Sequence, residues 1–209
     1  MLVLIGSGGH GKVVLEALLA SGVAAASVRV RDGSPDRWGS DLLGVKIEGP
    51  ELDAGVADAE VHVAIGSAEA RRRLYGEAEP LGARARTIVH PSARVSAFAT
   101  IEAGVFAAAG AVVGPAARVG RGAILNHNSV VDHDCEIGAW CHIAPGTILG
   151  GGVRLGEGVL IGAGAAVLPG VSIGKDAVIG AGAVVTRAVG AGETWVGVPA
   201  AKTIGSGKN

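Results

Sequence analysis

The pattern of hydrophobic residues changes about 90 residues into this chain of 209 residues. From Val95 to Val185 an aliphatic residue recurs at every sixth position, and the only lapse in the frame is Ala107. A small or β-branched residue stands two positions before each aliphatic one, and glycine often follows it directly. A fixed period sustained over so long a segment indicates a stack of repeated structural units. The aliphatic positions are Val95, Ile101, Val113, Val119, Leu125, Val131, Ile137, Ile143, Leu149, Leu155, Ile161, Val167, Ile173, Ile179 and Val185.

The six-residue period predicts a left-handed parallel β-helix. Three short strands make one coil of about 18 residues, and successive coils stack in parallel about 4.8 Å apart. We expect the aliphatic residue to point into the prism, the small residue to fit the crowded corner, and glycine to supply a positive φ there. Cys135 and Cys141 both occupy the small corner position, so they are predicted to be structural. No insertion interrupts the frame, so no lid loop is expected.

The first 90 residues have a pattern typical of a small α/β unit. An apolar run suited to a buried parallel strand precedes a glycine-rich turn, and helical spacing of apolar residues follows. The predicted elements are strands at 1–5, 26–30, 61–65 and 86–89, and helices at 12–20 and 70–75, the second capped by Ser67. Residues 33–60 can be assigned only to a connecting region.

These patterns together predict the fold class and two domains. An α/β N-terminal domain of βαβ type (half-Rossmann) is expected over residues 1–90. An all-β left-handed parallel β-helix with a C-terminal tail is expected over 91–209.

Charge and composition exclude several classes of function. The net charge of −1 gives neither a basic surface for nucleic acid nor a polybasic patch for membranes. The start of the chain lacks the charged region of a signal peptide, and no unbroken apolar stretch is long enough to span a bilayer. We therefore expect a cytoplasmic protein that binds neither nucleic acid nor membrane. Its two cysteines provide no disulfide framework.

Gly6, Gly8 and Gly11 form a G-x-G-x-x-G motif between a predicted strand and a predicted helix, and Asp32 follows about 20 residues later. Amide groups at such a helix N-terminus hold a pyrophosphate. The domain has room for only about four strands, about half of a dinucleotide fold. A nucleotide-sugar therefore fits better than NAD. The alternatives are a purely structural tight turn and, for Asp32, a solvated loop carboxylate.

The coil from Leu125 to Cys135 concentrates polar residues within an otherwise apolar repeat. His133 beside Asp134 is a general-base arrangement, because a carboxylate fixes the imidazole tautomer and stabilises the imidazolium ion. Since adjacent strand residues point to opposite faces, Asp134 would reach His133 only across a corner or in another subunit. His142 and Asn126 belong to the same unusual region. The alternatives are ordinary surface histidines and a zinc site between subunits, as in a carbonic-anhydrase-like enzyme.

Several motifs resemble the sugar O- and N-acetyltransferases, a hexapeptide-repeat family that includes sialic-acid O-acetyltransferases and nucleotide-activated amino-sugar N-acetyltransferases. The resemblance covers nearly the whole chain. The motifs are G-S-G-G-H-G at 6–11, V-A-I-G at 63–66, H-P-S-A at 90–93, V-V-D-H-D-C-x-I-G at 130–138, H-I-A-P-G at 142–146 and W-V-G-V-P-A-A-K at 195–202.

The resemblance implies that residues 1–90 form the nucleotide-sugar-binding domain and 91–209 the acyltransferase domain. It also implies a homotrimer with active sites between neighbouring prisms. His133 would be the general base and Asp134 would orient it. His142 would face the acetyl donor from across the interface, and the Gly151 amide would stabilise the oxyanion. Acetyl-CoA would be the co-substrate, and no metal is implied.

The resemblance also assigns binding residues. Acetyl-CoA would pass Ala163, Gly180 and Gly182 on its way to the C-terminal tail. The residues implied to bind the nucleotide-sugar are Ser7, Gly8, Gly9, His10 and Gly11 in the glycine-rich loop, with Asp32, Ile65, Gly66 and Asn126 around it.

The expected activity is transfer of an acetyl group from acetyl-CoA to the amine of a UDP-, GDP- or dTDP-linked 4-amino-4,6-dideoxy sugar in bacterial glycan biosynthesis. O-acetylation of a sugar such as sialic acid and non-catalytic binding of a nucleotide-sugar are the alternatives. His127 and Asn128 replace small residues of the family and are expected to reshape the sugar pocket. Arg31 before Asp32 departs from the paired acids of some relatives, which leaves the base open.

Overall fold

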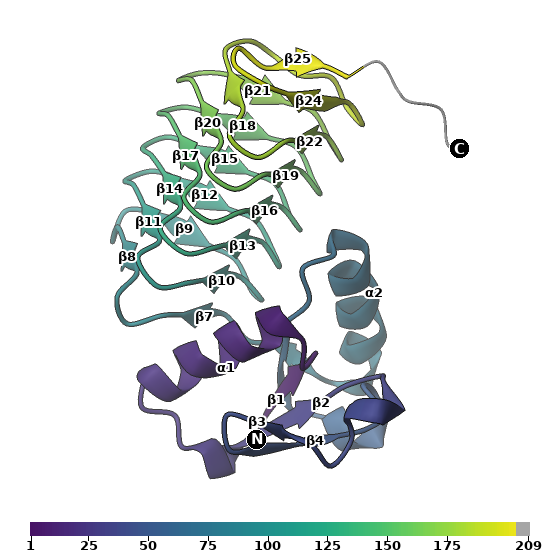
Figure 1. Cartoon of the computed structure of the whole chain (residues 1–209). Coiled ribbons are helices and arrows are strands. Elements are labelled where there is room, and N and C mark those ends of the chain that lie inside the picture. The colour runs from purple at the N-terminus through teal and green to yellow at the C-terminus, as the bar shows by residue number, and fades with distance from the viewer. Residues whose placement is uncertain (204–209) are drawn as a thin grey trace, which may run out of the picture.

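The computed structural model describes residues 1–203, in which a small α/β unit leads into a three-sided prism of stacked coils (Figure 1). The predicted second domain extends to residue 209, and its last residues, 204–209, lie outside the described residues. Within residues 1–203 no helix has the length and hydropathy needed to cross a membrane.

The α/β unit is built on a six-stranded sheet in the order β3-β4-β2-β1-β5-β6. All neighbours in it pair in parallel except β3 and β4. Short 3₁₀ helices lie at Ala25–Ser27, Pro35–Arg37, Ala54–Val56 and Glu79–Leu81. The other elements are β1 (Leu2–Ile5), α1 (Gly9–Ala20), β2 (Val28–Arg31), β3 (Asp41–Leu42), β4 (Val45–Glu48), β5 (Glu60–Val63), α2 (Ala68–Ala78) and β6 (Arg84–Ala85).

Three details of this unit differ from the prediction. The connecting region 33–60 contains β3 and β4, so the sheet has six strands rather than about four. The strand expected at 86–89 is reduced to β7 (Ile88–Val89), which pairs with the prism, and the α/β sheet ends with β6, before residue 86. Helix α1 begins at Gly9, inside the glycine motif, rather than at residue 12. The Ser67 cap is confirmed, since its Oγ accepts a hydrogen bond from the Ala70 N–H.

The prism consists of short parallel strands on three faces. Val112 pairs with Val130 and Val130 with Ile148, which confirms the step of 18 residues between coils. The first face contains β7, β10 (Phe106–Ala107), β13 (Ile124–Leu125), β16 (His142–Ile143), β19 (Leu160–Ile161), β22 (Val178–Ile179), β24 (Thr194–Val196) and β25 (Ala201–Lys202). The second contains β8 (Arg94–Val95), β11 (Val112–Val113), β14 (Val130–Val131), β17 (Ile148–Leu149), β20 (Ala166–Val167) and β23 (Val184–Val185). The third contains β9 (Thr100–Ile101), β12 (Arg118–Val119), β15 (Glu136–Ile137), β18 (Arg154–Leu155) and β21 (Ser172–Ile173).

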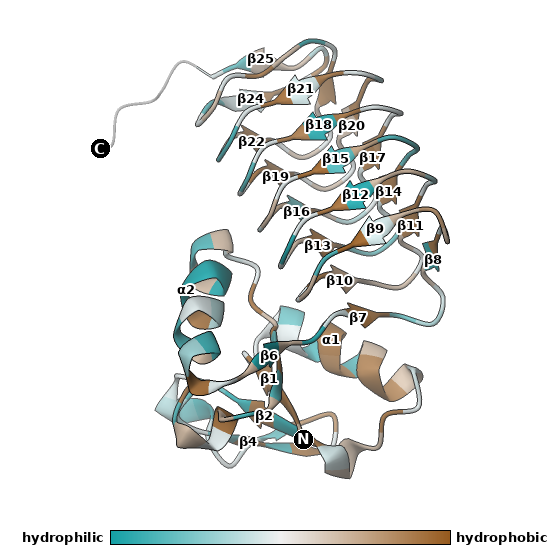
Figure 2. Ribbon diagram, turned by 180° about the vertical axis from the view of Figure 1, so that it is seen from behind, coloured by the Kyte–Doolittle hydropathy of each residue, from teal (hydrophilic) through white to brown (hydrophobic). Residues whose placement is uncertain are grey.

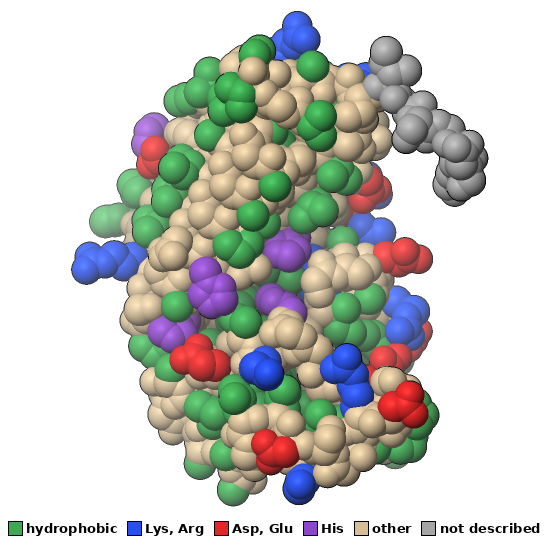
Figure 3. All heavy atoms as spheres, in the orientation of Figure 1, with side chains coloured by type: hydrophobic (Ala, Val, Ile, Leu, Met, Phe, Trp, Pro, Cys, Tyr) green, Lys and Arg blue, Asp and Glu red, His purple; other side chains and the backbone are tan. Residues whose placement is uncertain are grey.

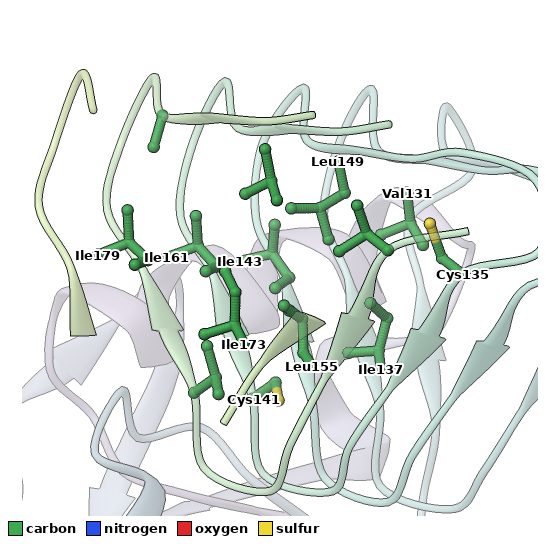
Figure 4. Packing of buried hydrophobic residues seen from close by; sticks show 14 of the residues in the cluster. Val131, Cys135, Ile137, Cys141, Ile143, Leu149, Leu155, Ile161, Ile173 and Ile179 are labelled. Carbon is green, nitrogen blue, oxygen red and sulfur yellow. The ribbon is translucent and has the colours of Figure 1, made fainter. Parts of the chain in front are cut away.

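The aliphatic residue of each hexapeptide points into the prism, as predicted. Figure 4 shows Ile143, Ile161 and Ile179 stacked along one row, and all three are buried. Cys135 and Cys141 lie in the same core, and both are free and buried. On each face, the second residues of successive strands therefore form a continuous apolar column from coil to coil.

The glycine that directly follows an aliphatic residue of the repeat has a different role from the one expected. The positive φ lies three positions after the aliphatic residue, for example at Gly122 (61°), Asn128 (55°) and Asp134 (58°), and not at the glycine that follows it directly. A Cβ at that directly following glycine would meet the backbone of the next coil, at 2.7 Å for Gly114 and 2.5 Å for Gly156. These glycines are required by close coil-to-coil contact rather than by φ.

The α/β unit covers the lower part of the first face. The outward-facing Phe106 and Ile124 are 0% and 1% exposed because they pack in one apolar cluster with residues of α1. Higher on the same face the outward row continues with His142, which is partly buried, and Leu160, which is exposed. The third face is polar, and Figure 2 shows hydrophilic segments on β12, β15 and β18. The junction between the two units therefore lies beside His142.

Within a single strand, β18, inward and outward residues should differ sharply in their contribution to stability. Leu155→Ala removes a core side chain that is 5% exposed, so we expect a loss of about 2–5 kcal/mol in the free energy of unfolding. Arg154→Ala removes only an exposed ion pair with Glu136 at 3.6 Å and should change it by less than about 1 kcal/mol. Chemical denaturation of the two variants measures the difference, and equal effects would contradict the inward–outward assignment.

Candidate active site

The loop between β1 and α1 combines packed glycines with open ones. A Cβ at Gly6 would lie 2.9 Å from the Ala64 carbonyl oxygen, and one at Gly11 would lie 2.1 Å from that of Gly6. A Cβ at Gly9 meets nothing within 4 Å, and one at Gly8 meets only a side-chain nitrogen of Arg37 at 3.9 Å. The first-turn amides of α1 have no side-chain cap. The loop is therefore tightly built at its ends and open to an anionic ligand in its middle.

Asp32, at the end of β2, organises this loop. One carboxylate oxygen accepts hydrogen bonds from the Ser7 amide at 2.8 Å and the Ser7 hydroxyl at 2.6 Å. The other oxygen accepts one from the Ser34 amide at 2.9 Å. Partial burial raises the pKa of Asp32, but these hydrogen bonds outweigh burial and the net pKa is lowered. Asp32 is thus neither a solvated loop carboxylate nor a side chain with both oxygens free for a base.

A pocket of about 420 Å³ opens over the glycine loop. Asp32, Ile65 and Gly66 line it, as the sequence led us to expect for a nucleotide site. Arg37 and Ser34 line it too, and neither was predicted. Both come from the connecting region 33–60, where no sequence motif marks them. Arg37 adds a cation beside the open amides, and its guanidinium donates to the Ser7 hydroxyl at 3.4 Å.

His10 extends from the glycine loop toward the prism. Its ring meets the ring of Phe106 edge-on, with centroids 5.4 Å apart, and lies 6.3 Å from the ring of His142. Its Nε2 atom is buried, and among the described residues it has no hydrogen-bond partner. Burial, followed by the charges of neighbouring groups that begin with His142, lowers the pKa of His10 to about 3. His10 is therefore a neutral group between the pocket over the glycine loop and the prism.

His142 and Asn126 form a pair on the first face. The Asn126 Oδ1 atom accepts from the His127 amide at 2.9 Å, so its Nδ2 group faces the His142 Nε2 atom at 3.2 Å. Nε2 then acts as acceptor, and the proton of the neutral ring is on Nδ1. Burial and the charge of Arg71 lower the pKa of His142 to about 4. His142 and Gly66 also line a larger pocket, of about 580 Å³, between α2 and the prism.

Asp134 reaches His133 across a corner of its own chain. The two residues lie at the turn between the second and third faces, and the positive φ of Asp134, 58°, bends the backbone there. The His133 Nδ1 atom and the Asp134 Oδ2 atom are 2.7 Å apart. This hydrogen bond, followed by the charge of Asp132, raises the pKa of His133. The Nε2 atom is left facing solvent, since the side chain is 58% exposed.

Gly151 lies directly above His133 on the next coil. A Cβ at Gly151 would be 2.5 Å from the His133 Nε2 atom, so a larger residue there would displace the imidazole ring from this position. Among the described residues, the Gly151 N–H donates to no backbone or side-chain acceptor. An unused amide donor thus lies beside the imidazole, in the relation that a general base and an oxyanion donor require.

One chain does not bring all the predicted residues together. His133, Asp134 and Gly151 share the corner between the second and third faces. His142 lies on the first face, and the prism core separates it from that corner. Figure 3 shows histidines gathered at the junction of the two units. The predicted acetyl-CoA residues Ala163, Gly180 and Gly182 follow one another along the corner between the first and second faces.

His127 and Asn128, which are expected to reshape the sugar pocket, lie at the corner between the first and second faces. Asn128 adopts a φ of 55° there, a conformation that asparagine tolerates better than most residues. His127 lines a small pocket with Lys12, Glu16 and Leu43. Within residues 1–203 no group of three or more His, Cys, Asp and Glu residues is placed to hold a metal ion.

Three protein-family models match segments of the chain. The PglD N-terminal domain matches residues 1–78, the GMPPB C-terminal domain matches 83–169, and the bacterial transferase hexapeptide (six repeats) matches 152–187. A search of curated proteins gave no match.

Among solved structures, the chain is similar to perosamine N-acetyltransferase from Caulobacter crescentus, with 39% identity over 97% of this chain and 96% of that one and a TM-score of 0.90. It is similar to the acetyltransferase domain of PglB from Neisseria gonorrhoeae, with 35% identity over 97% and 98% of the two chains and a TM-score of 0.89. It is also similar to WeeI from Acinetobacter baumannii, with 25% identity over 97% and 99% and a TM-score of 0.86.

Two of these relatives were solved with bound ligands. The Caulobacter protein was solved with CoA and GDP-perosamine, and in two of its structures one histidine is replaced by asparagine or alanine. The PglB domain was solved with acetyl coenzyme A.

The pairing of His133 with Asp134 predicts a measurable titration. Asp134→Asn removes the carboxylate that stabilises the imidazolium ion, so the pKa of His133 should fall toward or below its ordinary value of 6.5. NMR titration of the histidine ring protons measures this shift. Asp176→Asn is the matched control, because Asp176 occupies an equivalent corner with a φ of 54° but is remote from His133. A His133 pKa that is the same in the wild type and in Asp134→Asn would show that the hydrogen bond does not form in solution.

Proposed function

The chain belongs to the nucleotide amino-sugar acetyltransferase family of hexapeptide-repeat proteins, and from that premise we propose its particular reaction. It transfers the acetyl group of acetyl-CoA to the amine of a nucleotide-linked 4-amino-4,6-dideoxy sugar. The observation that carries this proposal is the His133–Asp134 pair beneath the unused amide of Gly151. A GDP-linked sugar is the first substrate to test, because the Caulobacter relative was solved with GDP-perosamine.

The α/β unit, residues 1–90, is proposed to bind the nucleotide-sugar. The diphosphate would lie on the open amides around Gly8 and Gly9, with Arg37 neutralising part of its charge. Asp32 would hold the loop in shape through Ser7. Ile65 and Gly66 would form the opposite wall, next to the larger pocket that contains His142. A sugar extending from the diphosphate would thus pass His10 on its way to the prism.

His133 is proposed to take the proton from the sugar amine. The amine attacks the thioester carbonyl carbon, a C–N bond forms, and the C–S bond of the thioester breaks. One proton passes from the nitrogen to the free Nε2 atom of His133, and from there to the leaving CoA thiolate. The Gly151 amide would donate to the oxyanion, an interaction on the order of 3 kcal/mol in comparable sites. Asp134 contributes by stabilising the imidazolium form.

Acetyl-CoA is proposed to lie along the prism in a groove made of small residues. Ala163, Gly180 and Gly182 follow one another on a single corner, and the Gly182 amide donates to the Ala163 carbonyl at 2.8 Å, which keeps that corner narrow. His142, whose neutral ring carries its proton on Nδ1, would contact the acetyl end or the sugar. We place the reaction in the cytoplasm, where acetyl-CoA is supplied, and in glycan biosynthesis, which uses nucleotide-linked sugars.

We further propose that the site is completed by a second copy in a homotrimer. The catalytic corner and His142 lie on different sides of one prism, so the two halves meet only if neighbouring prisms pack side by side. The second face supplies a suitable surface, because its outward row is apolar from β11 to β23 and Ile148 is 53% exposed on it. The third face bears charged residues instead. The outward residues of the second face are Arg94, Val112, Val130, Ile148, Ala166 and Val184, against Thr100, Arg118, Glu136, Arg154 and Ser172 on the third.

To test the reaction, the protein is given acetyl-CoA together with GDP-, UDP- and dTDP-linked 4-amino sugars or sialic acid. Acetyl transfer is measured as release of the free CoA thiol. His133→Ala should reduce kcat about 10²–10⁴-fold while acetyl-CoA binding persists, since it removes the base and leaves the fold intact. His90→Ala, in the first coil, is the control histidine and should retain activity. Turnover near that of the wild type in His133→Ala would remove the base assignment. Acetylation of sialic acid alone would favour the O-acetyltransferase, and binding of the nucleotide-sugar without turnover would favour a binding protein.

The shared site predicts complementation between two impaired variants. His133→Ala and His142→Ala should each lose most of their activity as pure proteins. When the two chains are co-expressed and assemble at random, roughly a quarter of the interfaces would pair an intact His133 with an intact His142. Activity should therefore reappear in the mixed trimers, measured after tandem-tag purification. A mixture no more active than its parents would mean that both histidines act from the same chain.

A further inference from the structure

Arg71 of α2 is a buried cation held entirely by backbone carbonyl groups. It is 1% exposed, and all five of its guanidinium N–H groups have acceptors. Nε donates to Gly122 at 2.9 Å. One terminal nitrogen donates to Ile65 and Gly66, and the other to Trp140 and Cys141, over distances of 2.5 to 3.3 Å. Among the described residues no carboxylate pairs with it.

These five carbonyls belong to three segments that are far apart in the sequence. Ile65 and Gly66 form a wall of the proposed nucleotide pocket. Trp140 and Cys141 lead directly into His142, and Gly122 occupies the same corner one coil below. The side chain of Arg71 therefore bonds the nucleotide pocket to the coil that carries His142, with both sets of acceptors on one rigid planar group.

The backbone at Trp140, whose carbonyl accepts from Arg71, is held in an unusual conformation by its neighbours. Trp140 has a φ of 63°, a conformation that bulky residues rarely adopt. Its indole lies 5.8 Å from the ring of Tyr75, and the guanidinium of Arg121 stacks 5.7 Å from its centroid. The carbonyl of Trp140 accepts a hydrogen bond from the Arg71 guanidinium, and its amide donates one to the Arg121 carbonyl oxygen at 2.8 Å. The surroundings thus hold an unfavourable backbone conformation immediately before His142.

A buried charge without a counter-ion is costly, so a purely apolar residue would make a cheaper contact between the two units. The neighbouring Arg72 also reaches the prism, through Glu157, but both side chains of that pair are about 40% exposed and can rearrange in solvent. Within residues 1–203, Arg71 is the one side chain that joins the two units by multiple buried hydrogen bonds of fixed direction. The hydrogen bonds of Arg71 therefore fix the position of the two units relative to each other, in addition to holding them together.

We propose that Arg71 is a positioning residue that sets the distance between the sugar amine and the coil that carries His142. The proposal rests on the function proposed above. The amine must come within about 3–3.5 Å of the thioester carbon, and an error of about 1 Å can cost about 10²-fold in rate. Because the α/β unit holds the nucleotide and the prism holds His142, the bonds of Arg71 determine how the two ends of the substrate are placed relative to each other.

The test compares Arg71→Lys and Arg71→Met with Arg73→Met in steady-state kinetics of the full-length protein. Arg73 lies on the same helix but is exposed and paired with Glu77 and Glu51, so its variant should behave as the wild type. Lysine keeps the charge with three donors, whereas methionine keeps only the length. We expect kcat/KM for the nucleotide-sugar to fall at least about tenfold in Arg71→Met and less in Arg71→Lys. KM for acetyl-CoA should stay within about twofold, since its groove lies on the prism.

Other outcomes would overturn this proposal. A fall in kcat alone, matched by the same fall in the fraction of protein that binds acetyl-CoA, would mean that Arg71 only stabilises the fold. Unchanged kinetics in Arg71→Lys and Arg71→Met would remove the positioning role. If Arg71→Met does not fold, Arg71→Lys alone decides, and the proposal then requires a raised KM or lowered kcat for the nucleotide-sugar only. Failure of the wild-type protein to acetylate any nucleotide-linked amino sugar would contradict the proposed function instead.

Discussion

Direct contact between successive coils is the constraint on which the rest of this structure depends. At Gly114 and Gly156 the next backbone lies so close that a Cβ would approach to 2.5–2.7 Å, so there is no space between these coils for a ligand. Inward residues fill the prism completely, as the 0% exposure of Ile143 and Leu149 shows. A prism packed in this way has no internal cleft. Chemistry is confined to the corners and to the outward row, and a second wall must come from another unit or another chain.

The outward residue of each strand therefore determines what each face of the prism meets. On the first face Phe106 and Ile124 are covered by the α/β unit, and the row then changes to His142 where that cover ends. The second face presents an apolar row from β11 to β23, and the third presents charged residues such as Arg118 and Glu136. One repeat thus supports three surfaces of different chemistry, because inward and outward positions vary independently. Both parts of the proposed site lie at edges of these surfaces.

Periodic features were predictable from the sequence, and single long-range contacts were not. The hexapeptide frame gave the strands, the inward column, the buried cysteines and the corner at which Asp134 meets His133. It misassigned the glycines, because spacing alone does not distinguish a positive φ from the absence of room for a Cβ. Arg37 and Arg71 were missed for a related reason. Arg71 bonds carbonyls up to 70 residues away, and a carbonyl acceptor leaves no trace in the residue type.

The histidines of the site divide into two electrostatic classes, and this division follows from their positions in the fold. His10 and His142 lie at the buried junction, where burial leads and neighbouring charges, including that of Arg71, add to it, so their pKa values fall to about 3 and about 4. His133 projects from an exposed corner beside Asp134, which raises its pKa. Groups whose environments separate their pKa values in this way are suited to different roles. Of these three, His133 is the one whose surroundings favour the protonated form, whereas the junction histidines remain neutral hydrogen-bonding groups. The junction that is proposed to position the sugar thus also prevents its histidines from competing for the proton.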